Sequence, residues 1–372
     1  MDAGRAGLLA AALATLVSAC AGGDAGGAAL PVVRRRGDIV YGADDRTEYF
    51  ALADASARAL ISGAMVALVS NQVLRSTGGD LARAPTWGDV DGLCPGEPFA
   101  DEPAAAFCSG VLVDWDLVLT AGHCARLLAI NDFEAVFDYY YDDSQRLAVR
   151  AGDSFPIAAI VAEALDTSGS APRLDYAWLR LARPASPPRQ PVSVHVAPPS
   201  LAKGAPVIAV GAGGGAPLKW DAGGHVQDPG AAWLDFFVVD ADDSAGSSGG
   251  GAFDHELSLL GITARGGTDF VTTPDGCQTT FRAPDSSGAA EEFTCAFRAV
   301  AGLCAAAPQA SSLCRAGCDE PCQALPAPVA GPDDGGCTLA GTGGGGAAGV
   351  TVTLAALALV LVRRRRLRSD RQ

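Results

Sequence analysis

The sequence predicts a loop-rich, all-β domain flanked by tails. Charged residues make up only 19% of the 372 residues, whereas glycine (46) and proline (23) are frequent. The apolar residues gather in short runs of strand length, separated by Gly, Pro, Asp and Ser. This combination is typical of short strands joined by turns rather than of long helices.

Charge and cysteine content restrict where such a domain works and what it binds. The net charge of −15 argues against a nucleic-acid partner. Eleven cysteines beside two methionines fit an oxidising compartment, in which disulfides persist. We therefore expect an exported protein, and the odd number of cysteines leaves at least one of them outside the internal pairs.

The amino-terminal residues 1–20 are predicted to be an export signal peptide. Arg5 gives a positive start, and Leu8–Val17 is an apolar stretch of signal length. The run VSAC that ends at Cys20 resembles a bacterial lipobox and makes this cysteine a candidate for lipidation; the alternative is an ordinary signal with an incidental cysteine. Residues 21–38 are rich in Gly and Ala and then basic, and we expect a linker or propeptide there.

Apolar runs beyond this point predict the strands of the domain. Ala59–Leu74 carries no charge and is predicted to form one or two buried strands, or a short helix that leads into a strand. Residues 76–103, with Cys94, are expected to form a surface loop held by a disulfide. Further strands are expected at Leu147–Arg150, Phe155–Val161, Leu174–Leu181, Pro206–Gly211, Leu234–Val239 and Leu259–Ala264. The proline-rich segment 184–199 is expected to connect the two halves of the fold.

A stapled hairpin at Phe107–Cys124 lies at the centre of the prediction. Two short apolar strands flank the polar turn Asp114–Asp116. A disulfide between Cys108 and Cys124 would close the hairpin, stabilise it by about 3 kcal/mol and hold His123 at its exit. A single histidine at the end of a stapled hairpin indicates a positioned base.

A second segment, GSSGG at residues 246–250, suits a nucleophile. A serine hydroxyl needs a base within hydrogen-bond reach, an orienting carboxylate, and amide donors where the oxyanion develops. Ser248 lies in this glycine-rich turn between two apolar strands, where a linker is not expected. The glycines allow a tight turn, which makes the amides of Gly246 and Ser248 candidates for an oxyanion hole.

Three segments together resemble the trypsin-like (chymotrypsin-fold) serine proteases: TAGHC at 120–124, LDYAWL at 174–179 and GSSGG at 246–250. Their order, His then Asp then Ser, is that of this family and not of subtilisins or α/β-hydrolases. The resemblance covers residues 39–305. It implies two packed antiparallel six-stranded β-barrels with the active site in the cleft between them. The run IVYGADDR from Ile39 is similar to the mature amino terminus of bacterial glutamyl-endopeptidase-like members.

The resemblance also assigns roles to single residues. Ser248 would be the nucleophile, His123 the general base and Asp175 the orienting acid. Ser247 stands where trypsins carry the Asp that pairs with the new amino terminus, which argues against that activation switch. Ser244 likewise replaces a family cysteine.

The resemblance points to a specificity pocket near Ser248. Asp242 stands where trypsin carries the Asp that binds Lys or Arg side chains, and a carboxylate there would favour a basic substrate residue. The remaining candidates for the pocket wall are Thr263, Ala264, Arg265 and Gly266. Arg265 would neutralise Asp242 or favour an acidic substrate residue instead.

The remaining cysteines predict further disulfides. Cys277–Cys295 is expected as a second local bridge. The pairing of Cys94, Cys304, Cys314, Cys318 and Cys322 stays open. Zinc is the weaker alternative for the carboxy-terminal cluster, since the window holds no His and the secretory context favours disulfides.

The tail is predicted to anchor the protein. Residues 306–342 form a Cys-, Pro- and Gly-rich linker, and residues 343–366 combine an apolar stretch of bilayer length with the cluster Arg363–Arg366 as a stop. This arrangement resembles the carboxy-terminal sorting tail of myxobacterial surface proteins; a plain membrane anchor is the alternative.

These observations predict an exported serine endopeptidase, monomeric and held at the cell surface or membrane or released outside the cell. It would cleave a protein or peptide substrate through an acyl-enzyme, without metal or cofactor. The alternative is a catalytically inactive, protease-like surface module that binds other proteins.

Overall fold

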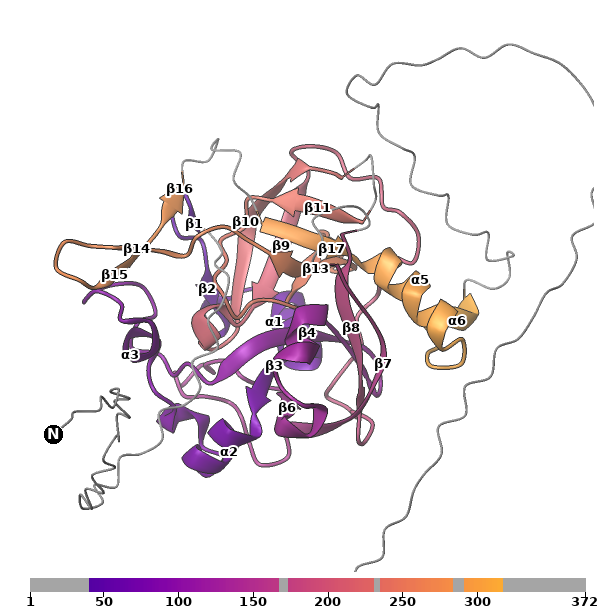
Figure 1. Cartoon of the computed structure of the whole chain (residues 1–372), viewed down its shortest axis with the longest axis horizontal. Coiled ribbons are helices and arrows are strands. Elements are labelled where there is room, and N and C mark those ends of the chain that lie inside the picture. Colours follow the sequence, from indigo (N-terminus) through magenta and orange to yellow (C-terminus); the bar gives the residue numbers. More distant parts are fainter. Residues whose placement is uncertain (1–39, 167–172, 231–234, 284–290, 317–372) are drawn as a thin grey trace, which may run out of the picture. The chain divides into compact units, whose positions relative to one another are not determined.

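The computed structural model describes residues 40–166, 173–230, 235–283 and 291–316 (Figure 1). Their strands form two antiparallel six-stranded β-barrels of the chymotrypsin type. The predicted signal, the linker 21–38, most of the linker 306–342 and the span 343–366 lie outside these residues. Within the described residues, no helix is long and apolar enough to cross a bilayer.

The first barrel closes in the order β3-β4-β5-β8-β7-β6. Its strands are β3 (Met65–Ser70), β4 (Ala106–Asp114), β5 (Leu117–Thr120), β6 (Phe133–Val136), β7 (Ser154–Leu165) and β8 (Asp175–Leu181). The predicted hairpin is the β4–β5 pair, in which Val111 faces Leu119. All of β5, and β4 except its last residue, is buried on both faces, which explains the continuous apolar runs in the sequence.

The second barrel closes in the order β9-β10-β11-β17-β13-β12 and back to β9. Its strands are β9 (Pro206–Gly211), β10 (Lys219–Asp228), β11 (Phe236–Val239), β12 (Gly251–Phe253), β13 (Leu259–Arg265) and β17 (Glu291–Cys295). Phe237 and Phe293 stack in its interior, with ring centroids 5.5 Å apart. Outside the ring, β2 (Thr47–Glu48) pairs with β10, β1 (Val40–Tyr41) with β16 (Arg282–Ala283), and β14 (Phe270–Thr272) with β15 (Gln278–Thr280).

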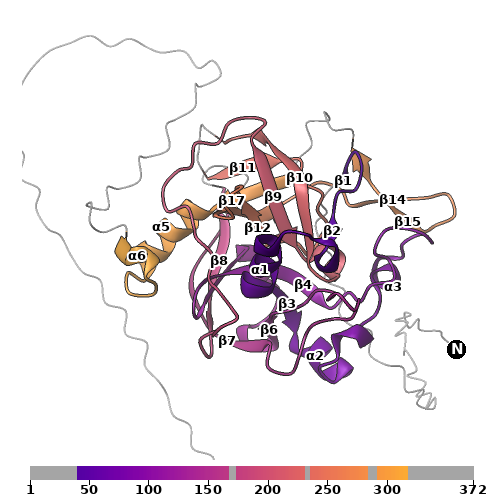
Figure 2. The ribbon, with the colours of Figure 1, turned by 180° about the vertical axis from the view of Figure 1, so that it is seen from behind.

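Two segments join the barrels. Residues 182–205 connect β8 to β9, and their backbone bonds to both barrels, at Leu112 and at Leu259. Helix α5 (Ala296–Ala306) follows the last strand of the second barrel but runs beside β7 and β8 of the first (Figures 1 and 2). The other helices are α1 (Ala55–Ala64), α2 (Asn71–Thr77), α3 (Trp87–Asp91), α4 (Gly122–Leu127) and α6 (Leu313–Ala316), with short 3₁₀ turns at Tyr49–Ala51, Leu81–Arg83, Ile130–Asp132 and Gly213–Gly215.

Two expected elements differ in the structure. Within Ala59–Leu74, α1 leads directly into β3, so the alternative of a helix that leads into a strand is confirmed. The last residues of this segment begin a second helix, α2. The strand expected at Leu147–Arg150 is wrong, because only Leu147 forms an isolated bridge, with Tyr141. A run of three apolar residues followed by an arginine is too short to decide between a strand and a packed loop.

The disulfides correct one predicted pair. Cys108 is bonded to Cys124 and Cys304 to Cys314. The predicted Cys277–Cys295 bridge is wrong, because Cys277 is bonded to Cys94 across a separation of 183 residues. Cys295 is a free thiol inside the second barrel, and burial raises its pKa to about 12. Cys318 and Cys322 lie outside the described residues.

Candidate active site

His123 is positioned by the exit of the stapled hairpin. Strand β5 ends at Thr120, and α4 starts two residues later at Gly122. A Cβ atom at Gly122 would lie 2.4 Å from the carbonyl oxygen of Ala164, so only glycine lets this turn pack so closely against the β7–β8 pair. The His123 side chain is 32% exposed and therefore accessible to a ligand.

Asp175 contacts both the backbone amide and the imidazole ring of His123. It opens β8, and its carboxylate is almost completely buried, with 3% of the side chain exposed. Its Oδ1 accepts a bond from the backbone amide of His123 at 2.9 Å, and its Oδ2 lies 2.9 Å from Nδ1 of the same residue. This double contact fixes the orientation of the imidazole ring and favours a proton on Nδ1, which leaves Nε2 as the basic nitrogen.

Ser248 lies in the loop between β11 and β12, and this loop is fastened to the first barrel. The amide of Ser109 in β4 donates to the carbonyl oxygen of Ser248 at 2.8 Å, and the Ser109 hydroxyl donates to the carbonyl oxygen of Gly246 at 3.0 Å. A Cβ atom at Gly249, where φ is +82°, would lie 2.2 Å from Oγ1 of Thr120. Loop and hairpin therefore approach each other more closely than another residue at 249 would permit.

The contacts of Ser248 place its backbone next to the histidine segment. The Sγ atom of Cys124 lies 3.6 Å both from the carbonyl oxygen of Ser248 and from Nε2 of His123. Among the described residues, no hydrogen bond joins Nε2 to the Ser248 hydroxyl. In enzymes, the hydrogen bond between a base and a nucleophile is often long without substrate and shortens when substrate binds.

The predicted oxyanion donors belong to the same loop. In the described part of the chain, the amides of Gly246 and Ser248 donate to no protein acceptor, whereas their neighbours Ser247, Gly249 and Gly250 all do. Two free amides on either side of a bonded one are available to an oxygen of a ligand.

Comparison with known protein families gives one match, which covers the segments of the candidate site. Residues 108–262 match the family model of the trypsin-like peptidase domain. His123, Asp175 and Ser248 all fall within the matched residues. The sequence matches no curated protein.

Among solved structures, the chain is similar to the VesB protease of Vibrio cholerae. The two chains are 18% identical, with a TM-score of 0.42, over 68% of this chain and 64% of the other. The alignment thus spans less than two thirds of the VesB chain.

Asp242, predicted to lie in a specificity pocket, contacts the amino-terminal segment of the described chain. Its side chain is buried, and it accepts bonds from the backbone amides of Tyr41 and Asp45, each at 2.7 Å. Both carboxylate oxygens thus hold the amino-terminal segment of the described chain. These bonds compete with the predicted role in binding a basic substrate side chain.

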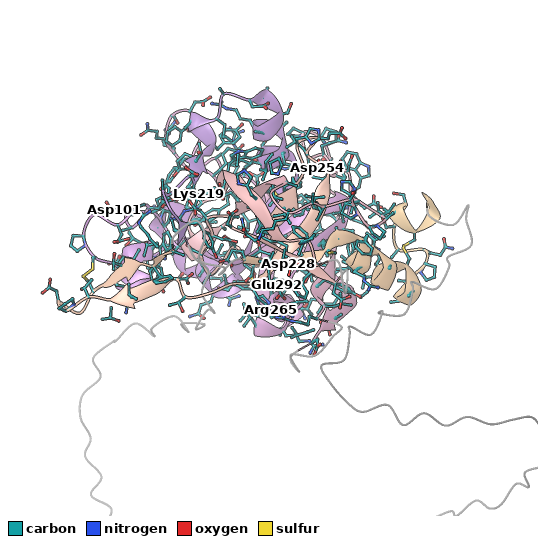
Figure 3. The ribbon with its side chains drawn as sticks, turned by 90° about the horizontal axis from the view of Figure 1, so that it is seen from above. Asp101, Lys219, Asp228, Asp254, Arg265 and Glu292 are labelled. Atoms are coloured by element: carbon teal, nitrogen blue, oxygen red, sulfur yellow. A yellow bond between two sulfur atoms is a disulfide. The ribbon has the colours of Figure 1, made fainter. Side chains whose placement is uncertain are left out.

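The other pocket candidates lie at the end of β13. Thr263 is buried and its hydroxyl donates to Asp243 at 3.3 Å; Ala264 is buried beside it, and Gly266 directly follows the strand. Arg265 makes no contact with Asp242 among the described residues. It pairs instead with Glu292 of β17, and Figure 3 labels these two side chains next to each other.

Buried acids surround a small pocket beside Ser247. Its lining includes Arg46, Gly211, Lys219, Asp221, Asp242 and Asp243. Burial raises the pKa of Asp221 and of Asp243 to about 6 and that of Asp242 to about 7. Arg46, with 4% of its side chain exposed, bonds to Asp44 and to the Ser244 hydroxyl and supplies positive charge there.

The disulfide next to His123 also bears on metal binding. The sulfur atoms of Cys108 and Cys124 and a ring nitrogen of His123 lie within 4.8 Å of one another. The two sulfurs are bonded to each other, however, and a disulfide has no thiolate to offer to a metal. The disulfide instead fixes the turn that carries His123.

Two contributors to the site were missed at the sequence level. Ser109 joins the barrels through its hydroxyl, which also accepts a bond from the amide of Ala212 at 2.9 Å. Its only signal is a serine inside an otherwise apolar run. Arg265 was expected at the pocket, but its approach to Asp175 has no sequence signal, because it depends on how the barrels face each other.

Proposed function

We propose that this protein is a serine endopeptidase in which Ser248 is the nucleophile, His123 the general base and Asp175 the orienting acid. The proposal is supported most directly by the two contacts of 2.9 Å between Asp175 and His123. They fix the ring and its tautomer, as general-base catalysis requires. The match of residues 108–262 to a peptidase family adds independent support.

The proposed reaction follows from these groups. Nε2 of His123 takes the proton from the Ser248 hydroxyl while Oγ bonds to the carbonyl carbon of the scissile peptide. The negative charge on the carbonyl oxygen is stabilised by the free amides of Gly246 and Ser248. His123 then gives its proton to the leaving amine, the peptide C–N bond breaks, and water hydrolyses the acyl-enzyme by the same route in reverse.

Labelling with a fluorophosphonate probe tests the proposal. The purified protein should be labelled, and Ser248→Ala and His123→Ala should each lose the label because nucleophile or base is absent. Ser76→Ala, which removes an exposed hydroxyl bonded only within its own helix, should be labelled like the wild type. Labelling that persists in Ser248→Ala would move the nucleophile elsewhere. A folded wild-type protein that takes no label would favour an inactive binding module.

We further propose that this peptidase is exported and held at the cell surface. The proposal rests on the signal-like residues 1–20, the apolar stretch with its arginine cluster at 343–366, and the three disulfides, which need an oxidising compartment. Mass spectrometry of the mature termini, together with cell fractionation, tests it. An intact amino terminus on a cytoplasmic protein would contradict it.

A further inference from the structure

One arginine ties the hairpin that carries Asp175 to the opposite barrel. Asp175 opens β8, and close to it the amide of Asp166, after β7, donates a hydrogen bond to the carbonyl oxygen of Leu174, before β8. Arg265, at the end of β13 in the second barrel, donates from Nη1 to the carbonyl oxygen of Arg173 at 3.2 Å and from Nη2 to that of Asp166 at 3.4 Å. A single guanidinium thus contacts the backbone both after β7 and before β8.

Glu292 holds this guanidinium in place. It is the register partner of Arg265 on β17, and its carboxylate bonds to Nη1 of Arg265. The same carboxylate also pairs with Nη2 of Arg173, from the first barrel, at 2.8 Å. Glu292 is 11% exposed and Arg265 23%, so water screens the cluster less than an open surface pair.

The same guanidinium approaches the carboxylate of Asp175. Nη2 of Arg265 lies 4.0 Å from Oδ2, the oxygen that also contacts Nδ1 of His123. Among the described residues, no other arginine or lysine has a side-chain nitrogen within 4.0 Å of this carboxylate. The buried negative charge of Asp175 therefore has one fixed cation beside it, besides its histidine.

We propose that Arg265 is the positioning residue for Asp175: it clamps the β7–β8 hairpin to the second barrel and sets a fixed positive charge beside the carboxylate that orients His123. The proposal rests on the serine-peptidase function proposed above and deepens it. The negative charge of Glu292 offsets the positive charge of Arg265, so that Arg265 repels the imidazole of His123 less when the ring takes up a proton. The elements packed around the pair also carry other charged or titratable groups: Arg126 on α4, Glu163 on β7, Tyr176 and Arg180 on β8, Arg173 and Asp235 beside the hairpin, Glu291 and Cys295 on β17, and Arg298 on α5.

Two substitutions of opposite charge test the clamp on the full-length protein. The readout is the rate constant of fluorophosphonate labelling as a function of pH. Arg265→Gln should lower the plateau rate about tenfold, because Asp175 is less well held. It should also shift the acid-limb midpoint upward by about half a pH unit, because removing a cation makes protonation of His123 easier. Glu292→Gln leaves the cation unbalanced and should shift the midpoint downward.

Conservative and distant variants separate positioning from general damage. Arg265→Lys should keep the midpoint near that of the wild type, because it keeps the charge, while regaining only part of the rate. Arg83→Gln removes the same charge from a pair in which the arginine side chain is 74% exposed, and should change neither quantity. Equal losses of rate in Arg265→Gln and Glu292→Gln without opposite shifts would overturn the proposal.

A readout that needs no nucleophile separates this proposal from the peptidase function. The chain has four histidines, so the ring signals of His123 can be assigned by NMR with a His123→Ala variant. Opposite shifts of its titration midpoint in the two variants would support the clamp even if the wild type takes no probe. A labelled wild type whose His123 midpoint is the same in both variants would overturn the clamp and leave the peptidase function intact.

Discussion

At the scale of single residues, the site depends on side chains that serve two segments at once. Ser109 bonds both to Gly246 in the loop that carries Ser248 and to Ala212 after β9. Asp175 receives the backbone and the ring of His123. Asp242, six residues before Ser248, accepts hydrogen bonds from the backbone amides of Tyr41 and Asp45 and so holds the amino-terminal segment of the described chain. Each of these residues converts a distant contact into a fixed position of the site.

The buried Asp242 predicts a pH dependence of stability. Burial raises its pKa from 3.8 to about 7 in the folded protein. The folded state therefore binds this proton more tightly than the unfolded state, and the associated stability is lost as pH rises from about 4 through 7. Measured against Asp242→Asn, which does not ionise, the wild type should lose about 2 kcal/mol between pH 5 and 8.

Chemical denaturation at several pH values measures this difference. Asp242→Asn should be less stable than the wild type at pH 5, because the amide NH2 group cannot accept the second backbone bond, whereas the hydroxyl oxygen of the protonated carboxyl can. The difference in unfolding free energy between the two proteins should decrease towards pH 8. Asp101→Asn, a substitution of an exposed carboxylate, should follow the wild type throughout. A gap that widens with pH would show that the Asp242 carboxylate is stabilised in its ionised form.

At the scale of elements, disulfides hold the loops around the two barrels. Cys94 lies in the loop between α3 and β4, a strand of the first barrel. Cys277 lies between β14 and β15, which follow β13 of the second barrel. Their disulfide therefore joins loops of different barrels. Cys304–Cys314 closes only the short turn between α5 and α6. The chain-entropy model expects the longer loop to give the larger stabilisation.

Removing each of these two disulfides should lower the free energy of unfolding by a different amount. The double variant Cys94→Ser/Cys277→Ser, with a separation of 183 residues, should lose about 5 kcal/mol of unfolding free energy. Cys304→Ser/Cys314→Ser, with a separation of 10, should lose about 3 kcal/mol. Urea denaturation of the oxidised proteins measures both. The reverse order would mean that native packing around α6, rather than loop length, determines the stabilisation.

At the scale of the whole described domain, the barrels are joined at several independent places. Four features link residues of the first barrel to the second: the connector 182–205, helix α5, the Cys94–Cys277 disulfide and the contacts of Arg265. Trp178, fully buried in β8, donates from Nε1 to the carbonyl oxygen of Ala299 in α5 at 2.9 Å. We therefore expect both barrels to unfold together in one transition.

Trp178→Phe tests this coupling. It removes the bond to Ala299 and leaves a small cavity between β8 and α5, which should cost about 2–4 kcal/mol. Calorimetry should show one transition at a lower temperature. Trp115→Phe, at a side chain that is 40% exposed, should change stability by less than about 0.5 kcal/mol. A first transition that melts only one barrel would refute the coupling.

Part of the fold could be predicted because several strands are apolar over most of their length. Pro206–Gly211 coincides with β9, and Leu174–Leu181 differs from β8 by one residue. Strands β10, β12 and β17 were missed because they carry polar residues or glycines, such as Asp221 and Glu292, that interrupt the apolar pattern. Helix α5 was missed because its alanine-rich sequence shows no marked polar face.

By itself, the sequence determined the all-β class, the stapled hairpin and the order of the three motifs that carry the candidate site. These features are local, and a strand, a turn or a short motif is specified within a few neighbouring residues. The tertiary structure alone decided that Cys94 pairs with Cys277, that Asp242 binds the segment near Tyr41, and that Arg265 reaches the hairpin of Asp175. These contacts join residues 183, 201 and about 90 positions apart, and such separations become neighbours only when the chain has closed both barrels.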